Sequence, residues 1–317
     1  MGAVDLSAAV AAALAEGRPV VALASSAIAQ GLPWPANFET CLDCEDAVRS
    51  ARAEPATIAV VEGRLRVGLG RDQLEKLAAQ GSRKLTARDL GPAVAAGLSG
   101  ATTASASLRV AALCGIRFLA TGGLDGVHRP EAGGPEDTSA DLVELTRSPL
   151  AVFCAGVTAV LDVAATYQRL ESLGVPVVGY GCMELPAFYT ARSGVAAPFM
   201  VTGPAGVAQA LAASWSCGAR AVVVAIPPPE ELIDAAGLIQ QALKQVAGMS
   251  GPKQAPAALD AVAALSGGRA MAVNRRLLTN NAAVAGACAA KWVKGGYGEQ
   301  RKGSDPPAER YGLFDDR

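Results

Sequence analysis

Short apolar runs alternate with helical patterns along most of this 317-residue chain. The runs are rich in Val, Ile and Ala and end at Gly, Pro or Ser, which is typical of buried strands. Strands that alternate with helices predict a largely parallel sheet with helices on both faces. We therefore expect an α/β fold, a three-layer α/β/α sandwich, with strands near 19–23, 56–61, 64–69, 116–120, 150–154, 175–180, 199–201 and 219–225. The predicted helices include the N-terminal alanine run, 37–53, 103–114, 204–216, 230–249, 255–266 and 274–291.

One stretch, residues 115–141, concentrates the polar chemistry of the chain. Its strand leads into a Thr-Gly-Gly turn at 121–123 and then into a glycine-rich loop that holds the only histidine. Ligands of α/β sheets bind at the carboxyl ends of strands, where helix N-termini also converge. The loop ends with three residues that offer oxygen atoms, Asp137, Ser139 and Asp141. We expect the active site here, and the alternative is a solvated surface loop.

Two further polar segments are candidates for the same pocket. Lys84 stands between two predicted helices, and a turn of small residues at 100–103 leads into the helix 103–114. A lysine is usually a solvated surface charge, but these two segments can flank one pocket. Ser25 and Ser26 follow the first strand and can hold a phosphate, although capping a helix is the commoner use.

Composition narrows the possible partners. Lys and Arg number 28 against 29 Asp and Glu, a net charge of −1, so no broad basic face predicts nucleic-acid binding. No stretch is apolar for long enough to span a membrane, and the N-terminus has no basic region before its alanine run. We expect a cytoplasmic protein.

The seven cysteines are scattered and odd in number, which does not predict a disulfide framework. Cys41 and Cys44 form a single CxxC within a helical pattern. Buried thiols explain this spacing better than a metal or redox site does.

Domain organisation follows from the same pattern. We expect one domain over residues 1–292 and a flexible tail over 293–317, because the tail is rich in Gly, Pro and charge.

Several ordered segments resemble the pseudouridine-5′-phosphate glycosidase family, also described as indigoidine synthase A-like. The resemblance covers residues from about 19 to 290. The matching segments are VALASSAIAQGLPWPAN at 21–37, PATIAVVEGRLRVGL at 55–69, KLTARDL at 84–90, GLSGATT at 97–103, ATGGLDGVHR at 120–129, DTSADLVEL at 137–145, CAG at 154–156, GVPVVGYGCMELPAFY at 174–189 and NRRLLTNNAAVA at 274–285.

The resemblance implies an α/β/α sandwich, a homotrimer and a single manganese (or magnesium) ion near the sugar phosphate. It also implies chemistry at the carbon–carbon bond between ribose 5-phosphate and uracil. In that chemistry C1 of the opened sugar is held as a Schiff base on a lysine, because a protonated imine is a good electron sink. A glutamate moves the proton of the base.

Family roles carry over to several positions. Lys84 matches the substrate-contacting lysine, Asp137 the metal-binding acid, and His128 the histidine of a stretch that reads GGVHR in the family. The remaining matches are predicted substrate contacts: Ser25, Thr103, Ala104, Thr121, Ser139, Asp141 and Asn274.

The two central catalytic positions depart from the family. Ala24 stands where the family has its glutamate, and Thr158 where it has its Schiff-base lysine. Gln30 replaces a common histidine, and Thr279 a common lysine. A hydroxyl cannot form an imine and a methyl group cannot carry a proton, so the family's usual mechanism is not available to these residues.

Three hypotheses follow. The first is a C-glycoside synthase that joins ribose 5-phosphate to a carbon acceptor other than uracil, with Lys84, Asp141 and His128 as catalytic groups. The second is a pseudouridine-5′-phosphate glycosidase with relocated catalytic groups. The third is a non-catalytic sugar-phosphate-binding protein. The sequence does not identify the acceptor, although Gln30, Trp34 and the loop 181–189 are expected to shape its pocket.

Overall fold

The computed structural model describes residues 4–27, 32–79, 82–129, 137–249 and 254–297. Nine strands follow one another across the sheet in the order β1-β4-β3-β2-β7-β8-β11-β9-β10, and β6 joins β3 and β5 beside this path. The strands are β1 Val4–Leu6, β2 Val20–Ala24, β3 Glu54–Val61, β4 Arg64–Val67, β5 Arg83–Leu85, β6 Gly100–Thr102, β7 Phe118–Ala120, β8 Ala151–Cys154, β9 Val177–Tyr180, β10 Phe199–Val201 and β11 Val222–Ala225.

The sheet is largely parallel, as predicted. Neighbours from β2 through β7, β8, β11 and β9 to β10 all run in the same direction. Among the described strands, only the pairings of β3 with β4 and with β6 are antiparallel. The first of these is the hairpin that the alternating pattern at 56–69 indicated.

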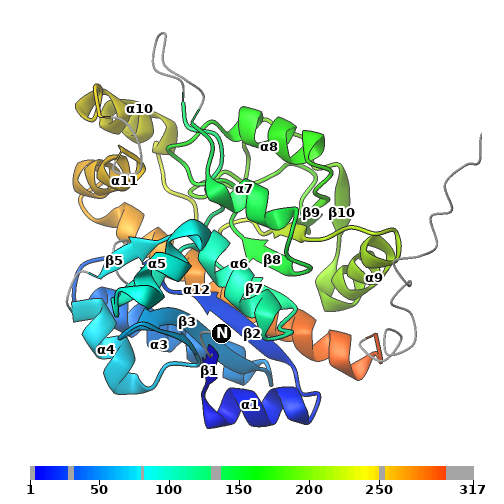
Figure 1. Cartoon of the computed structure of the whole chain (residues 1–317). Coiled ribbons are helices and arrows are strands. Elements are labelled where there is room, and N and C mark those ends of the chain that lie inside the picture. Colours follow the sequence, from blue (N-terminus) through cyan, green and yellow to red (C-terminus); the bar gives the residue numbers. More distant parts are fainter. Residues whose placement is uncertain (1–3, 28–31, 80–81, 130–136, 250–253, 298–317) are drawn as a thin grey trace, which may run out of the picture.

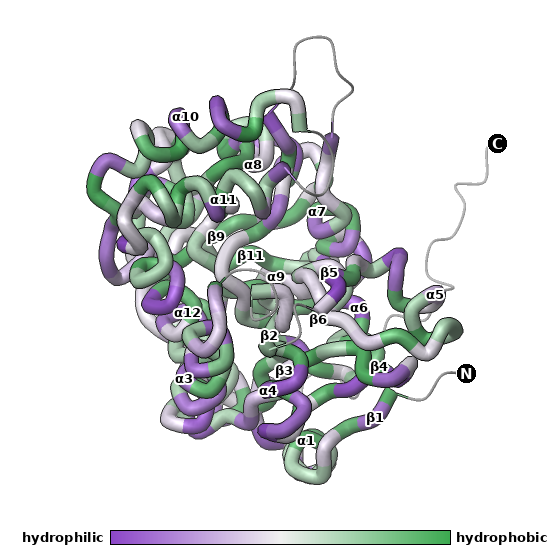
Figure 2. Tube along the Cα trace, turned by 90° about the vertical axis from the view of Figure 1, so that its left-hand side faces the viewer, coloured by the Kyte–Doolittle hydropathy of each residue, from purple (hydrophilic) through white to green (hydrophobic). Residues whose placement is uncertain are grey.

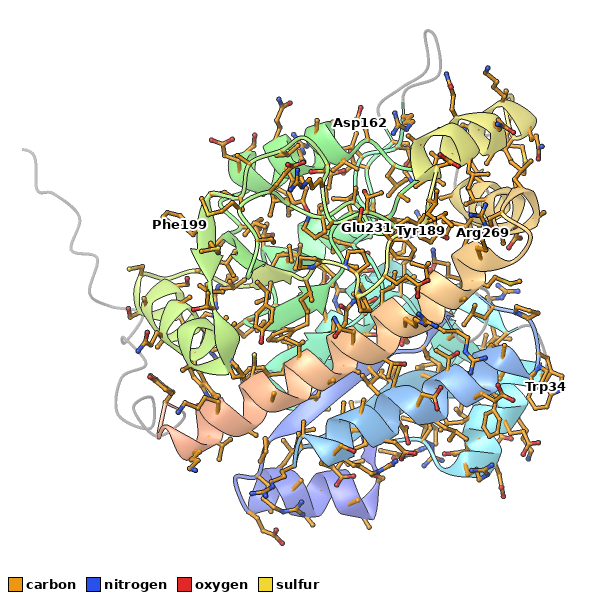
Figure 3. The ribbon with its side chains drawn as sticks, turned by 180° about the vertical axis from the view of Figure 1, so that it is seen from behind. Trp34, Asp162, Tyr189, Phe199, Glu231 and Arg269 are labelled. Carbon is orange, nitrogen blue, oxygen red and sulfur yellow. The ribbon has the colours of Figure 1, made fainter. Side chains whose placement is uncertain are left out.

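Helices cover both faces of the sheet and give the predicted three layers. Helix α6 packs against β2, β3 and β7 in front of the sheet, with α7 beside it (Figure 1). Helix α12 crosses β2, β7 and β8 on the other face and lies along α3 (Figure 3). The helices are α1 Ala8–Ala15, α3 Ala36–Ser50, α4 Arg71–Ala79, α5 Leu90–Ala95, α6 Ala104–Leu113, α7 Ala140–Leu145, α8 Val163–Ser172, α9 Gly203–Ser216, α10 Ala235–Gln245, α11 Gln254–Leu265 and α12 Arg269–Lys294, with a short 3-10 turn at Ala87–Asp89.

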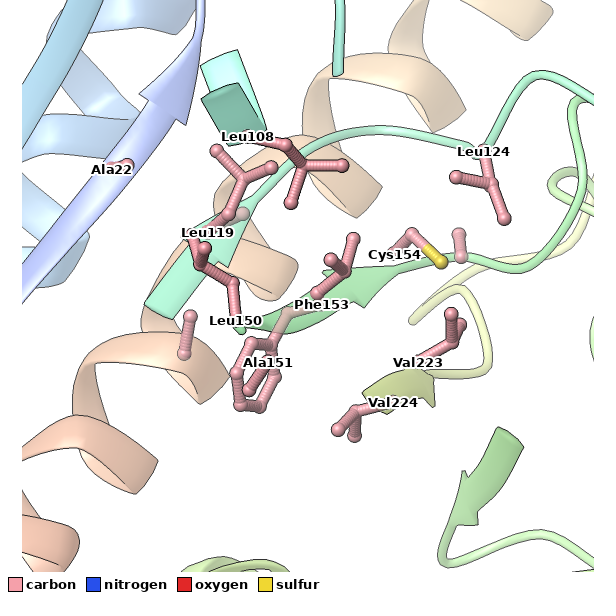
Figure 4. Close-up of a cluster of buried hydrophobic side chains, with 14 of the residues drawn as sticks. Ala22, Leu108, Leu119, Leu124, Leu150, Ala151, Phe153, Cys154, Val223 and Val224 are labelled. Atoms are coloured by element: carbon pink, nitrogen blue, oxygen red, sulfur yellow. The ribbon is translucent and has the colours of Figure 1, made fainter. Parts of the chain in front are cut away.

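The core lies between these layers and the central strands. Every residue of β8 and β11 is buried, which explains why both read as continuous apolar runs rather than as alternating ones. Phe153, Leu119 and Leu108 pack there from β8, β7 and α6 (Figure 4). Hydrophilic segments gather on peripheral helices such as α3 and α4 (Figure 2).

Four elements differ from the sequence-based expectation. Residues 4–6 form β1, parallel to β4, before the alanine-rich helix begins. Lys84 and the turn at 100–103 belong to short strands, β5 and β6, which pair with each other. Helix α12 starts five residues before the predicted residue 274 and continues through Lys294.

The end of the described chain is packed on the body. The ring of Tyr297 stacks on Trp292, with centroids 5.2 Å apart, so the first residues of the expected tail contact the protein. The rest of the tail, and Gln30, lie outside the described residues. None of the described helices is both long enough and apolar enough to cross a membrane.

Candidate active site

A pocket opens where β2, β6, β7 and β8 end. Its empty volume is about 690 Å³. It is lined by Ser26, Ala27, Lys84, Thr103, Ala104, Thr121, Gly122, Gly123, Asp125, Asp141, Thr158, Phe188, Pro256, Leu259 and Asn274. We call it the polar pocket. The turn at 121–123, where the active site is expected, forms part of its lining.

Strand pairing carries Lys84 to this pocket. Lys84 lies opposite Ala101 in the parallel pair of β5 and β6, and Thr103 N–H donates to the Leu85 carbonyl at 2.9 Å. The strand that holds the lysine is therefore fixed against the turn that enters α6. The two polar segments do flank one pocket, as expected.

Lys84 forms an ion pair that the sequence analysis missed. Its Nζ lies 3.3 Å from Oδ2 of Asp125. The side chains of Lys84 and Asp125 are 30% and 28% exposed. The other oxygen of Asp125 accepts a hydrogen bond from the Thr158 hydroxyl at 2.9 Å. Asp125 thus connects Lys84 with Thr158, the position at which the resemblance implies a second lysine.

Asp141 lies behind this pair and is 3% exposed. Its carboxylate accepts the Ser105 N–H at 2.7 Å and the Asp125 N–H at 3.2 Å. Burial, aided by the charge of Asp125, raises the pKa of the Asp141 carboxyl to about 7, although the Ser105 N–H and Lys84 oppose this. Asp141 can therefore gain or lose a proton near neutral pH.

The pKa of Lys84 is raised. Burial alone would lower the pKa of its amine, but the carboxylates of Asp125 and Asp141 outweigh burial. Lys84 is therefore an ammonium group at neutral pH. In that form it donates hydrogen bonds and stabilises negative charge, and it must lose a proton before it can act as a nucleophile.

The N-terminus of α6 adds a site for negative charge. Thr103 caps this ten-residue helix by accepting the Ala106 N–H, and its hydroxyl is 2.8 Å from that of Ser105. Backbone N–H groups at a helix N-terminus favour anions. Together with Lys84, this end of α6 is suited to a phosphate or an oxyanion.

The turn after β7 is held in place by α12 and needs glycine. Asn281 donates from Nδ2 to the carbonyls of Thr121, at 2.8 Å, and Gly122, at 3.1 Å. A side chain at Gly123 would place its Cβ 2.7 Å from the ring of Phe188. The close approach of this turn to Phe188 therefore depends on glycine.

The structure brings together most of the predicted site residues, but not all. Lys84, Thr103, Ala104, Thr121, Asp141, Asn274 and Thr158 line the polar pocket, whereas Ser25, His128, Asp137, Ser139 and Ala24 are not among its described lining residues.

Each residue outside the lining has an observed place. Ser25 is fully buried, where its hydroxyl donates to the Ile58 carbonyl and accepts the Thr102 N–H. The Ser139 hydroxyl caps α7. His128 and Asp137 pair through their backbones, with His128 N–H donating to the Asp137 carbonyl at 2.9 Å.

The missed lining residues are Ala27, Asp125, Pro256 and Leu259, whereas Phe188 comes from the loop 181–189 that was expected to shape a pocket. Asp125 stands at the first position of the stretch that reads GGVHR in the family, and this departure was the available signal. Pro256 and Leu259 come from α11, whose apolar spacing indicates a core helix equally well.

Ala24 lines a second cavity, which we call the apolar pocket. Its empty volume is about 410 Å³, and it shares Ala27 and Thr121 with the polar pocket. The other described lining residues are Leu23, Leu32, Asn37, Thr40, Cys41, Cys44, Ala120 and Leu278.

The described residues do not form a ready-made metal cage. Among them, no group of three or more His, Cys, Asp or Glu side chains is placed to hold an ion. Asp137 is exposed and supplies one carboxylate. This donor set suits only a weakly held Mn²⁺ or Mg²⁺ whose other ligands are water and substrate oxygens.

Comparison with known proteins identifies the family. The family model described as indigoidine synthase A like protein matches residues 9–291. The chain belongs to this family. A protein of Deinococcus radiodurans named pseudouridine-5′-phosphate glycosidase is 45% identical over 298 residues, which cover 92% of this chain and 95% of that protein. A protein of the same name from Nocardioides sp. is also 45% identical and covers 90% and 95%.

Two solved structures extend the likeness. One is the prealnumycin C-glycosynthase AlnA in complex with ribulose 5-phosphate, with a TM-score of 0.83 and 36% identity over 92% of this chain and 97% of that one. The other is an indigoidine synthase A-like protein of Thermotoga maritima, with a TM-score of 0.82 and 28% identity over 88% and 94%. The indigoidine synthase A-like fold predicted from the sequence is confirmed.

Proposed function

We propose that this chain makes or breaks the bond between C1 of ribose 5-phosphate and a carbon atom of an acceptor. The observation that carries the proposal is the arrangement of the Lys84 ammonium with the carboxyl groups of Asp125 and Asp141 in one pocket. This arrangement combines a hydrogen-bond donor for a carbonyl oxygen with an acid or base whose pKa is near 7.

The relatives support the substrate class. The curated relatives are named for pseudouridine 5′-phosphate, and the AlnA structure contains a pentulose 5-phosphate. In this chain the N-terminus of α6, with the Ala104 N–H, is suited to the phosphate group. Thr121 and Asn274 line the space between and offer hydrogen bonds to sugar hydroxyls.

The proposed reaction is an addition to the open-chain aldehyde, followed by ring closure. The acceptor carbon bonds to C1 of the open-chain aldehyde and gives its proton to Asp141. The C1 oxygen takes a proton from Lys84, which Asp125 holds in place. The C4 hydroxyl then displaces the C1 hydroxyl as water, so ribose 5-phosphate and acceptor give a C-glycoside and water. Cleavage is the reverse sequence.

Lys84 also allows an imine variant of this step. The amine would first give its proton to a carboxylate and then condense with the aldehyde, which releases the water at that stage. The raised pKa of Lys84 favours the ammonium form, so we place hydrogen-bond donation first. His128 stays a candidate proton carrier from the resemblance alone.

The first candidate acceptor is uracil, because the relatives' names favour pseudouridine 5′-phosphate. This makes the chain a pseudouridine-5′-phosphate glycosidase with relocated catalytic groups. The second candidate is C-glycoside synthesis with another acceptor. It is favoured by the methyl group of Ala24, which lines a cavity beside the polar pocket.

Metal binding and assembly remain proposals. We propose a weak divalent cation at Asp137, which would help to neutralise the sugar phosphate, and a homotrimer. Manganese titration monitored by electron paramagnetic resonance tests the first, with Asp137→Asn as the variant. Sedimentation analysis tests the second.

The function is tested by three measurements on the purified protein. These are ribose 5-phosphate binding by calorimetry, cleavage of pseudouridine 5′-phosphate, and borohydride trapping with peptide mass analysis. We expect saturable binding that Lys84→Ala weakens at least tenfold. A trapped adduct on Lys84 would move the mechanism to the imine variant. Absence of ribose 5-phosphate binding would contradict the proposal.

A further inference from the structure

Asp125 joins a cation and a buried carboxyl group in the wall of the polar pocket. Its carboxylate holds the Lys84 ammonium at 3.3 Å, and its backbone N–H donates to Oδ2 of Asp141 at 3.2 Å. Lys84 and Asp141 are therefore both held by residue 125, and all three residues line the polar pocket. The pocket thus presents a proton donor beside a proton acceptor.

Asp141 is arranged to take a proton from a carbon atom. The Ser105 N–H fixes its Oδ1 at 2.7 Å, and each carboxylate oxygen keeps a second lone pair for a substrate proton. A base for this task works best when its pKa is near the working pH. Asp141 meets this condition, because it is 3% exposed and burial raises its pKa to about 7.

The other described titratable groups that face Asp141 have fixed charges near neutral pH. Asp125 is a carboxylate and Lys84 an ammonium group. The Cys154 thiol on the neighbouring strand is neutral, because burial raises its pKa to about 12. A change of protonation at pH values near 7 therefore takes place on Asp141 itself.

Lys84 is arranged to stabilise the charge that such a proton transfer creates. When a proton leaves the carbon next to a carbonyl group, the electron pair moves to the carbonyl oxygen. An ammonium group beside that oxygen stabilises the resulting oxyanion. Burial would lower the pKa of Lys84, but the carboxylates of Asp125 and Asp141 raise it and keep the amine charged for this task.

The sugar carbonyl meets no second amine here. Lys84 is the only lysine among the described residues that line the polar pocket, and the Thr158 hydroxyl is bonded to Asp125 at 2.9 Å. The open-chain aldehyde of ribose 5-phosphate therefore keeps its C1 oxygen in the presence of the Lys84 ammonium. The acidic hydrogen next to that aldehyde is the one on C2.

We propose that this chain also interconverts ribose 5-phosphate and its 2-ketose isomer, ribulose 5-phosphate, by moving a proton between C2 and C1. This inference rests on the proposed function, because it places the same sugar phosphate in the polar pocket. It requires no acceptor and no carbon–carbon bond to form or break. Asp141 is the base that serves both carbon atoms, and Lys84 is the proton donor to the oxygen atoms.

The isomerisation is balanced without a second substrate. The Asp141 carboxylate takes the proton from C2, the electron pair of that bond forms a C1–C2 double bond, and the C1 oxygen takes a proton from Lys84. The Lys84 amine then takes the proton of the C2 hydroxyl, a carbonyl group forms at C2, and C1 takes the proton from Asp141. C1 is reduced, C2 is oxidised, and both side chains return to their first state.

The test is incubation of ribose 5-phosphate alone with the purified full-length protein in D2O. Proton NMR and mass spectrometry measure the formation of ribulose 5-phosphate and the entry of deuterium at C1 and C2. We expect isomerisation at least about 100-fold faster than in protein-free buffer, as for a positioned acid or base. The rate should increase as the pH rises through about 7, because the carboxylate form of Asp141 takes the proton.

Two variants and a matched control assign the activity to this pocket. Lys84→Ala and Asp141→Asn should each lower the rate at least about 100-fold, whereas Arg83→Ala, at the exposed neighbour of Lys84, should stay within about twofold. Far-UV circular dichroism and melting temperature verify that each variant folds. A host isomerase carried through purification would act equally in all preparations, so activity that survives in both site variants overturns the inference.

Parallel measurements on the same preparation separate this inference from the proposed function. Calorimetry measures ribose 5-phosphate binding, and mass spectrometry measures C-glycoside formation. Saturable binding with C-glycoside formation, but with neither ketose nor deuterium exchange, overturns the inference and leaves the proposed function standing. Ketose formation that depends on Lys84 and Asp141, without C-glycoside formation or cleavage, supports the inference and contradicts the proposed function.

Discussion

The polar and apolar pockets share two wall residues but differ in almost every other property. Around the polar pocket an ammonium group and two carboxyl groups lie close together, and one carboxyl is almost completely buried. Around the apolar pocket the described side chains are uncharged, and the Asn37 amide and the Thr40 hydroxyl bond to backbone carbonyls.

Under the proposed function, the charged groups of the polar pocket lie where C1 of the sugar would react. There they would stabilise the C1 oxygen and move the proton of the acceptor.

Removing the ammonium group should have the largest effect. Lys84→Ala deletes the only described cation of the polar-pocket lining and leaves Asp125 and Asp141 uncompensated. We expect turnover to fall at least about 1,000-fold, in line with the loss of a main transition-state donor. Steady-state kinetics measure this. Arg83→Ala, on the neighbouring exposed residue, is the control, and equal loss in both variants would indicate a structural effect.

Asp141→Asn should lower the rate by about 100-fold or more, as expected for a positioned acid or base. In the wild type, synthesis should increase as the pH rises through about 7, because the carboxylate must accept a proton. Cleavage should decrease over the same range. A pH profile that is unchanged in the variant would exclude Asp141 from proton transfer.

The raised pKa of Asp141 also predicts how the free energy of unfolding depends on pH. Because its pKa is raised on folding, Asp141 stabilises the fold at low pH, and this contribution is lost as the pH rises from about 4 to 7. Asp141→Asn removes this dependence. Urea unfolding measures the free energy of unfolding of both proteins. The stability of the variant relative to that of the wild type should be greater at pH 8 than at pH 5.

Two substitutions introduce, at positions 24 and 158, the residues that the resemblance implies for the family. Ala24→Glu places a carboxyl group in the apolar cavity, and Thr158→Lys places an amine beside Asp125. The double variant should gain pseudouridine 5′-phosphate cleavage at least about tenfold over the wild type. Cleavage assays measure the gain, and each single variant is a control. An inert double variant with intact nucleotide binding would contradict this account of the two positions.

Asp125→Asn should have an intermediate effect of about tenfold on the rate. It removes the carboxylate that raises the pKa of both Lys84 and Asp141, so both values should fall. The amide oxygen can still accept the Thr158 hydroxyl. The measurement is the pH profile, whose inflection near 7 should move to lower pH; an inflection that stays in place would remove Asp125 from the electrostatics of the site.

The smallest effect is expected for Asn281→Ala, which releases the turn after β7 from α12. The loss of two hydrogen bonds to the Thr121 and Gly122 carbonyls should raise the KM for the sugar phosphate about threefold to tenfold. Asn280→Ala, at the neighbouring helix position, is the control. A KM that stays within twofold of the wild type would show that other contacts hold the turn.

Much of this fold was predictable, because buried parallel strands appear in the sequence as continuous apolar runs and amphipathic helices as apolar residues with a helical repeat. The failures were short elements. β1, β5 and β6 read VDL, RKL and GAT, so none is a continuous apolar run like the equally short β7 and β10, and their pairing partners stabilise them. The predicted central loop did contribute Asp125 and Asp141 to the pocket.

Residues of the candidate site could be predicted only where the side chain itself suggested a chemical role or where the position matched the family resemblance. Lys84, Thr121 and Asp141 were found in this way. Asp125 was missed because an acid directly before a glycine is also a common turn residue. Its partner Lys84 is 41 residues away in the sequence and lies on β5, a strand that was not predicted. Ser25 is the opposite case. It was predicted to contact the substrate, but its hydroxyl forms hydrogen bonds within the core.

The proposed carbon–carbon bond can be sought directly. Ribose 5-phosphate is incubated with the protein and with uracil, or with 1-naphthol as another carbon nucleophile, and products are analysed by mass spectrometry. We expect a product of the summed masses minus water that resists acid hydrolysis and is absent with Lys84→Ala. Saturable ribose 5-phosphate binding without any such product, and without cleavage of pseudouridine 5′-phosphate, would rule out the proposed function.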